Sequence, residues 1–194
     1  MMRKTLLAVL VSGAMVSGAQ AAGDQVNGYL FGNVGQADYD FGNYFKPFIG
    51  SVDDTDTAFK VGAGVQLNPF VGIEFQYVDL GEATYKEPNY KEMVEVEGYG
   101  MNVVGTIPLD RVKLYGKVGY HKMEFEARGK QDGFGTVWSG SEKDWVVSYA
   151  LGATFAIIPQ LELVAEYERY DDVADKVGLN VDIDLASLGL RYNF

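Results

Sequence analysis

The last nine residues of the chain alternate between two kinds of side chain, and this pattern strongly constrains the fold. Apolar or aromatic side chains occupy Ala186, Leu188, Leu190, Tyr192 and Phe194, and small or polar ones occupy Ser187, Gly189, Arg191 and Asn193. Because a β-strand places successive side chains on opposite faces, the pattern predicts a strand with one apolar face. Aromatic residues at the end of such a face are typical of a strand that lies against lipid. The hypothesis that follows is a transmembrane β-barrel.

Seven earlier segments alternate in a similar way. We expect these strands within residues 26–36, 58–66, 71–78, 94–107, 112–121, 145–155 and 161–168. The gaps between strands are of two kinds: short Pro-containing turns at 67–69, 107–110 and 158–160, and long polar loops at about 37–57, 81–93, 127–141 and 171–180. Short turns on one rim and long loops on the other are typical of outer-membrane barrels. The sequence therefore predicts an all-β fold, an eight-stranded antiparallel up-and-down transmembrane β-barrel with four long extracellular loops and three short periplasmic turns.

The aromatic residues of the apolar faces are sorted by depth. Strand direction alternates, so the distance from each short turn indicates how deep a residue lies. The aromatic residues near the long loops are Phe59, Tyr77, Tyr120, Trp145 and Tyr167, and those near the short turns are Phe155, Tyr192 and Phe194. Mostly aliphatic residues lie between the two sets, with Phe75 and Tyr149 as exceptions. Two aromatic girdles around an aliphatic band match the two interfaces of a membrane.

The first 21 residues predict a secretory signal peptide. Arg3 and Lys4 precede a mostly apolar run at 6–16, and Ala19-Gln20-Ala21 provides a small-residue cleavage site. The apolar run is too short to cross a bilayer as a helix. We therefore expect residues 1–21 to be a signal peptide and residues 22–194 to form one domain in the cell outer membrane, reached through the periplasm.

Charge and cysteine content restrict the chemistry. The chain has a formal net charge of −11, and loss of Arg3 and Lys4 with the signal peptide makes it −13. This balance disfavours nucleic acid, because phosphate binding needs clustered lysine and arginine. The chain has no cysteine, which excludes disulfides, thiolate metal sites and cysteine nucleophiles. We predict no cofactor or resident metal, although calcium or magnesium is an alternative at the acidic loop residues Asp53, Asp54, Asp56, Glu92, Glu95, Glu97, Asp171, Asp172 and Asp175.

The face opposite the apolar one carries charges that would point into the barrel. Judged from the short turns, Glu74, Lys117 and Glu166 share a middle depth. The residues expected below them are Lys113, Glu162 and Arg191, and those expected above are Lys60, His121 and Glu168. An eight-stranded barrel is only wide enough for its own side chains, so these charges must pair. The network predicts either a structural plug of salt bridges or a gate that rearranges to pass small solutes.

Several segments resemble the transmembrane domain of the OmpA family. The resemblance is strongest at 62–81, at Ala156-Ile157-Ile158-Pro159-Gln160 and at the closing stretch 187–194, and it covers essentially the whole mature chain. It implies a salt-bridged interior with Glu74 and Glu166 at matching positions, and Val103 and Val164 where that family has a lysine and an arginine. It also implies that Tyr192 and Phe194 form the signal for the outer-membrane assembly machinery. The last residue is Phe194, and we therefore expect no counterpart of the periplasmic peptidoglycan-binding domain of OmpA, which makes compact barrels of the OmpX, OmpW and opacity type comparable models.

An enzymatic role is the main hypothesis of another class. Small barrels that modify lipid A need a histidine base beside a serine nucleophile. The only histidine is His121, and the lipid A deacylase family has a serine where this chain has Met123. Ser148 and Ser187 lie on other strands, and the sequence does not connect them to His121. We therefore predict no catalytic residues.

The expected function is structural, with surface contacts that support envelope integrity or adhesion. A narrow porin-like channel is the first alternative, and a lipid A-modifying enzyme is a less favoured one. The expected partners are outer-membrane lipid, lipopolysaccharide and the assembly machinery. The first long loop is rich in aromatic residues that would either pack over the barrel mouth or contact a host or phage partner: Tyr39, Phe41, Tyr44, Phe45 and Phe48. A monomer is expected.

Overall fold

The structure is a computed structural model of the chain, and it describes residues 26–40, 51–53, 55–87, 90–131, 135–173 and 181–194. The strands in these ranges are β1 (Asn27–Asp40), β2 (Ser51–Asp53), β3 (Thr55–Asn68), β4 (Val71–Glu87), β5 (Tyr90–Leu109), β6 (Val112–Gln131), β7 (Gly135–Ile158), β8 (Leu161–Val173) and β9 (Val181–Asn193). No helix in the described residues is long and apolar enough to cross a membrane. The predicted signal peptide lies outside the described residues.

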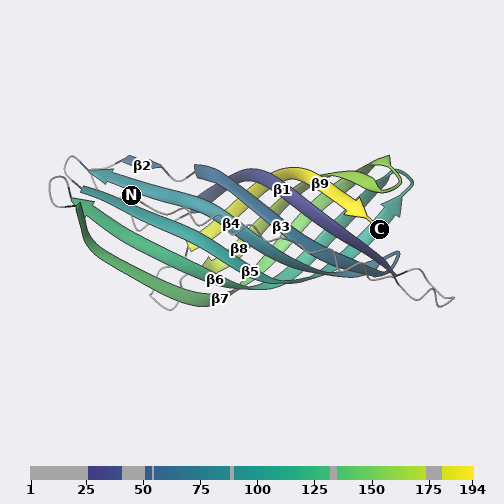
Figure 1. Ribbon diagram of the computed structural model, residues 1–194, viewed down its shortest axis with the longest axis horizontal. Helices are drawn as coiled ribbons and strands as arrows, with labels where there is room; N and C mark the ends of the chain where they lie inside the picture. The colour runs from purple at the N-terminus through teal and green to yellow at the C-terminus, as the bar shows by residue number, and fades with distance from the viewer. Residues whose placement is uncertain (1–25, 41–50, 54, 88–89, 132–134, 174–180) are drawn as a thin grey trace.

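Eight of these strands close into a ring (Figure 1). Each long strand pairs antiparallel with its neighbour along the chain, and β1 pairs with both β3 and β9. The pairing of β4 with β5 completes the circle, while the short β2 adds only to the loop end of β4. Closure leaves no long open sheet edge, which is a requirement for a sheet that spans a bilayer. The prediction of an eight-stranded up-and-down barrel is confirmed.

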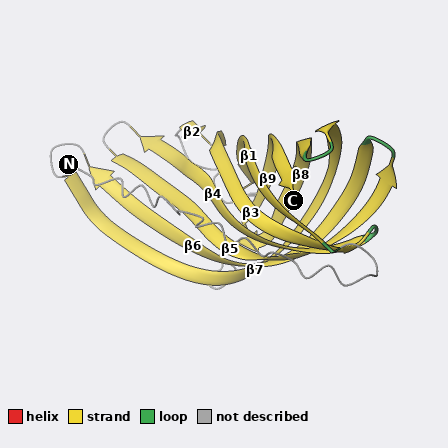
Figure 2. Ribbon diagram, turned by 45° about the vertical axis from the view of Figure 1, so that its right-hand side comes forward, coloured by secondary structure: helices red, strands yellow, loops and turns green. Residues whose placement is uncertain are grey.

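The strands on the loop side are longer than the sequence predicted. The segment 81–93 was expected to be a loop, but after an irregularity between Asp79 and Glu82 the pairing of β4 with β5 continues to Glu87 opposite Tyr90. Residues 88–89 lie outside the described residues. Most of 127–141 is likewise paired strand in β6 and β7. Figures 1 and 2 show β4 to β7 extending past the loop ends of β8 and β9. The predicted loop boundaries were therefore wrong for these two hairpins.

The three short turns lie where the prolines predicted them. In the first turn, the Asn68 side chain accepts hydrogen bonds from the backbone N–H groups of Phe70 and Val71, at 2.9 and 3.0 Å. In the second, Asp110 takes a positive φ of 55°, a conformation that aspartate tolerates better than most residues. These compact turns form the periplasmic rim, on the same side as the C-terminus.

Side chains alternate between the lipid face and the interior, with one correction to the prediction. The family resemblance aligns Val103 with an interior lysine, but its side chain is 59% exposed on the outer wall, and the neighbouring Val104 is fully buried inside. Two adjacent valines left the phase of β5 ambiguous, because both could fit the apolar outer face. Val164 lies in the interior, as expected.

The interior of the loop half contains a hydrophobic core that the sequence analysis did not predict. Its members are Ala37, Tyr39, Ala58, Val78, Leu80, Val96, Met123, Phe125, Val146, Tyr170, Val181, Ile183 and Leu185. All are buried, and they come from every strand of the ring. We call this set the apolar layer.

Candidate functional site: the charged interior of the barrel

Four charged side chains from four strands meet in the middle of the barrel. Lys117 on β6 forms ion pairs with Glu74 on β4 and with Glu166 on β8, the latter at 2.8 Å. Arg191 on β9 adds a second cation, with its guanidinium 3.0 Å from Glu74. The exposed fraction of each of these side chains is 5% or less. The middle depth predicted for Glu74, Lys117 and Glu166 is where the structure brings them together.

Two tyrosines that the sequence analysis missed complete this cluster. Tyr29 donates a hydrogen bond of 2.8 Å to Glu74, and Tyr115 donates one of 2.6 Å to Glu166. Arg191 also lies 4.3 Å from the centre of the Tyr29 ring. Tyr29 can reach across because Gly64 has no side chain: a Cβ there would lie 2.2 Å from the ring. The inward phase of β1 and β6 could have revealed both tyrosines.

A second group of buried charges lies nearer the loops. Lys60 on β3 forms ion pairs with Glu166 and with Glu168, the latter at 2.7 Å. Glu168 also accepts hydrogen bonds of 3.0 Å from the Gln76 amide and from the Ser148 hydroxyl. Glu166 therefore links this group to the middle cluster. We call the two groups together the charged layer: Tyr29, Lys60, Glu74, Gln76, Tyr115, Lys117, Ser148, Glu166, Glu168 and Arg191.

The predicted lower group is divided in the structure. Lys113 and Glu162 pair at 2.5 Å near the turn side, where Lys113 is partly exposed. Arg191 does not join them in an ion pair, because its guanidinium points to Glu74. Arg191 lies directly opposite Glu162 in the pairing of β8 with β9, at the depth expected for the lower group, but its long side chain extends to the carboxylate of Glu74 in the middle cluster.

His121 lies at the junction of the charged layer and the apolar layer. Its ring is fully buried and lies edge-on to Tyr170, with 5.5 Å between ring centres. Within the described residues, neither ring nitrogen has a hydrogen-bond partner. A Cβ on Gly119 would lie 2.4 Å from His121 Cε1 and 2.6 Å from Ser148 Oγ, so the two side chains converge over this glycine.

The geometry around His121 does not activate a nucleophile. A serine nucleophile needs its hydroxyl to donate to the histidine base. Here the Ser148 hydroxyl donates to Glu168 instead, and Ser187 bonds with the carbonyl of Glu166 at 3.5 Å. All of these groups are buried inside the barrel. Where side chains are described, no three carboxylates or histidines gather closely enough to hold a metal ion.

The predicted girdle residues all lie on the outer wall. On the loop side, the rings of Phe59 and Tyr77 lie 6.2 Å apart, and those of Tyr120 and Trp145 stack at 4.9 Å. Tyr99 belongs to the same row but was not included in the predicted girdle; it is 48% exposed and lies opposite Tyr77 in the register. On the turn side, Phe155, Tyr192 and Phe194 are exposed.

A closed ring of eight strands with an apolar outer band, two aromatic girdles and short turns on one rim defines an integral outer-membrane β-barrel. Comparison with known proteins agrees. Residues 6–194 match the family described as the outer membrane protein beta-barrel domain, and the chain belongs to this family. It is 27% identical over 198 residues to outer membrane protein A of Shigella flexneri and 29% identical over 200 residues to that of Salmonella typhi. Both matches cover 100% of this chain and 56% of the relative, so the chain spans about half the length of these relatives.

Solved structures show the same fold. Ail, the attachment invasion locus protein of Yersinia pestis, superimposes with a TM-score of 0.61 at 17% identity, covering 88% of this chain and 99% of Ail. Neisserial surface protein A superimposes with a TM-score of 0.58 at 16% identity, covering 86% and 97%. The predicted OmpA-type family, fold and outer-membrane location are therefore confirmed.

Proposed function

We propose that this protein is a structural barrel of the outer membrane that does not conduct and that presents its long hairpins for contacts at the cell surface. The observation that carries the proposal is the filling of the interior by two stacked layers. The charged layer occupies the middle, and the apolar layer occupies the loop half. A solute that crossed the barrel would have to displace both.

The charged layer resists opening because its groups depend on each other. Glu166 forms ion pairs with Lys60 and Lys117 and accepts a hydrogen bond from Tyr115. Moving one partner would leave a buried carboxylate uncompensated, which costs about 3–5 kcal/mol. The network therefore supports a plug more than a gate with a low barrier.

The apolar layer opposes ions for a different reason. Met123, Ile183 and Leu185 are at most 1% exposed and offer no polar atoms to an ion that loses its water. An ion without compensating ligands is strongly disfavoured in such surroundings. This layer supports a sealed barrel even if the charged layer rearranges.

Planar-bilayer recordings of the purified full chain test the sealed barrel. We expect no stepwise conductance at neutral pH in symmetric potassium chloride, with a porin of known conductance as positive control. Reproducible single-channel steps that depend on this protein would contradict the proposal.

A narrow channel is the second candidate, and one observation favours it. Several buried polar atoms in the interior have no hydrogen-bond partner among the described residues, including Thr106 Oγ1, Asn33 Oδ1 and Arg191 Nε. Such atoms commonly bind buried water. Swelling of liposomes in small neutral solutes would support this candidate, and absence of swelling would support the sealed barrel.

The charge of the described hairpins indicates the kind of surface partner they would accept. Ail has been solved in complex with the heparin analogue sucrose octasulfate. In this chain acidic residues predominate among the charged outward residues of the described hairpins, as at Glu95, Glu97, Glu126 and Asp182. We expect a basic surface partner and no retention on heparin at physiological salt; strong retention would contradict this. Of the aromatic residues considered for host or phage contact, Tyr39 is buried in the apolar layer, and those at 41–48 lie outside the described residues.

The C-terminal aromatic residues are proposed to serve assembly of the barrel in the outer membrane. The Phe194 backbone N–H donates to Gly28 at 3.0 Å, which ties the end of the chain to β1 where the ring closes. Deletion of Phe194 is expected to lower the amount of barrel inserted in the outer membrane; normal insertion would contradict this.

Catalysis is not part of the proposed function. Mass spectrometry of lipid A from cells with and without the protein should show no difference.

A further inference from the structure

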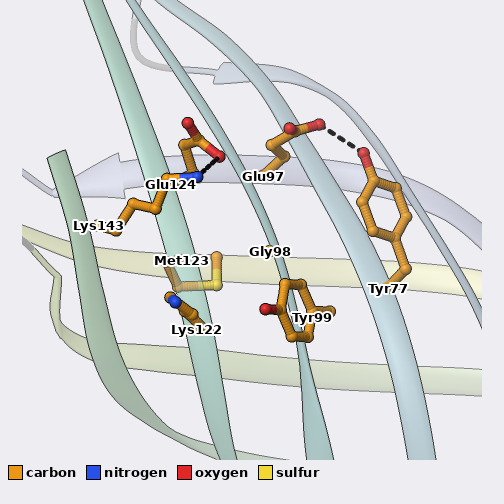
Figure 3. A pocket seen from close by; sticks show the side chains of 8 residues that line it. All are labelled: Tyr77, Glu97, Gly98, Tyr99, Lys122, Met123, Glu124 and Lys143. Carbon is orange, nitrogen blue, oxygen red and sulfur yellow. Dashed lines mark hydrogen bonds and ion pairs between the residues drawn. The ribbon is translucent and has the colours of Figure 1, made fainter. Parts of the chain in front are cut away.

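A pocket lies on the outer wall of the barrel at the level of the loop-side girdle. Figure 3 shows its lining residues, which are Tyr77, Glu97, Gly98, Tyr99, Lys122, Met123, Glu124 and Lys143. They come from β4, β5, β6 and β7, and the register places Lys122 directly between Tyr99 and Trp145. Lys122 and Tyr99 are on the outward phase of their strands, and the lining also includes the inward-phase residues Gly98 and Met123, the latter a member of the apolar layer.

Lys122 differs from the other charged residues of the pocket in its partners. Lys143 forms an ion pair with Glu124 at 2.7 Å, and Tyr77 donates a 2.5 Å hydrogen bond to Glu97 (Figure 3). Lys122 forms no ion pair with any described residue, and its ammonium lies 6.0 Å from the centre of the Trp145 ring. Lys122 is therefore a cation beside an aromatic surface, with its charge available to a ligand.

The position of the pocket restricts the kind of ligand. Aromatic girdles lie at the headgroup level of a bilayer. On the turn side of the pocket the outer wall is apolar: Phe75, Met101 and Tyr120 form the next row, and Val103 and Val118 lie beyond it, all exposed. A molecule bound here at the outer leaflet would place a polar group on Lys122 and its acyl chains over these residues.

We propose that this pocket binds a phosphate group of the outer-leaflet glycolipid, the phosphorylated lipid A part of lipopolysaccharide. Lys122 is its main ligand, and Lys143 supplies a second ammonium beside it. Ammonium groups bind phosphate as compact charges. The charges of Lys122 and Lys143 are balanced by those of Glu97 and Glu124. Inorganic phosphate would therefore gain little binding free energy from the pocket alone, and binding also needs the contact of the acyl chains with the outer wall.

The test measures binding of purified bisphosphorylated lipid A to the full chain in detergent micelles by native mass spectrometry. The variants are Lys122→Gln, Lys143→Gln and Lys122→Arg. Arg169→Gln is the matched control, because Arg169 is an outward cation at the loop end of β8, away from the pocket, where it pairs with Asp182. Lys122→Gln is expected to weaken binding about tenfold, as for loss of one charged hydrogen bond. Lys143→Gln is expected to have a smaller effect, and Lys122→Arg and Arg169→Gln are expected to bind as the unmodified chain does.

Two further ligands separate the sources of binding. Lipid A without its phosphates should bind the unmodified chain as weakly as bisphosphorylated lipid A binds Lys122→Gln, and inorganic phosphate should not compete. Equal losses in Lys122→Gln and Arg169→Gln, or equal binding of the two lipids, would overturn the proposal. Competition by inorganic phosphate would overturn the assignment to a glycolipid. None of these results depends on whether the barrel conducts.

Discussion

The charged layer and the apolar layer lie in the same barrel, but the strands place polar and apolar side chains on opposite faces of the wall in the two layers. Within the membrane, β6 directs Leu114 and Val118 outward and Lys117 inward. Beyond the girdle the same strand directs Glu124 outward and Phe125 inward. β9 reverses in the same way, with Leu188 outward and Arg191 inward at one end, and Asp182 outward and Ile183 inward at the other.

The reversal follows the solvent outside the wall. Where the wall faces lipid, apolar side chains belong outside, and polar groups must be paired inside. Where the wall faces water, the same ring can bury an apolar core as a soluble barrel does. The apolar layer therefore stabilises the extracellular half by burial, and the charged layer depends on exact pairing for its stability. Each prediction below tests one side of this difference.

The largest effect is expected from loss of a central cation. Lys117→Ala leaves Glu74 and Glu166 each without one buried partner, so the free energy of unfolding should fall by about 3–5 kcal/mol. The matched control is Lys143→Ala, which removes one exposed ion pair worth about 0–1 kcal/mol. Urea unfolding in micelles, followed by tryptophan fluorescence, measures both. Equal losses would mean that the charged layer does not stabilise the barrel.

Truncation in the apolar layer should cost somewhat less. Ile183→Ala leaves a cavity among fully buried side chains, and the free energy of unfolding should fall by about 2–5 kcal/mol. Leu188→Ala on the lipid face of the same strand should cost less, because lipid or detergent fills the space. The same urea titration compares them. A smaller loss for Ile183→Ala than for Leu188→Ala would show that the extracellular half is not held by a packed core.

The junction between the layers should tolerate loss of its polar group. His121→Phe removes two buried nitrogens that have no hydrogen-bond partner among the described residues, so stability should be unchanged or rise by about 1 kcal/mol. Ser148→Ala, one strand away, should lower stability because its hydroxyl donates to Glu168. A clear loss of stability in His121→Phe would reveal a polar role for this histidine.

The smallest effect is expected at the rim. Asp79 follows the girdle residue Tyr77 on β4 and lies beyond the membrane-spanning segment. Burial raises the pKa of its carboxyl, and Glu97 and Asp56 raise it further against the opposing hydrogen bond from Gly81. The folded barrel thus holds the proton more tightly than the unfolded chain, and this stabilisation is lost as pH rises through the raised pKa.

Asp79→Asn removes that titration. At neutral pH the variant should be more stable than the unmodified protein by no more than about 1 kcal/mol, and the difference should vanish as pH falls below the ordinary carboxyl range. Urea titrations at several pH values measure it. A variant that is less stable at neutral pH would contradict the assigned effect of burial.

Much of the membrane-spanning part could be predicted because its strands direct apolar side chains outward and polar or small ones inward throughout. The turns, the outer girdles and the inward side of Lys117 all follow from period two and the position of the prolines. The hairpin ends could not be recognised, because Glu95, Glu97, Glu124 and Glu126 made strands look like polar loops. Polar and apolar residues still alternate there, but the polar side chains face outward and the apolar ones inward. A search that allowed either arrangement would have found these strands.

Contacts across the barrel were less predictable than the faces of the strands. Counting from the turns gives the depth of a backbone position, and Arg191 does lie opposite Glu162, but the count does not show that its long side chain extends to Glu74. The adjacent Val103 and Val104 did not show which residues of β5 face outward. The pocket at Lys122 was missed because it depends on which residues four strands place side by side.

The claim that both layers seal the barrel is most directly tested by thiol labelling, since the chain has no native cysteine. Ser148→Cys reports on the charged layer, Ala58→Cys on the apolar layer, and Ser141→Cys on an exposed position. A small charged methanethiosulfonate reagent is applied to the folded protein in liposomes, and the added mass is measured. We expect Ser141→Cys to be labelled fully while the two interior cysteines stay unmodified until urea unfolds the barrel. Rapid labelling of both interior cysteines in the folded protein would contradict the sealed barrel.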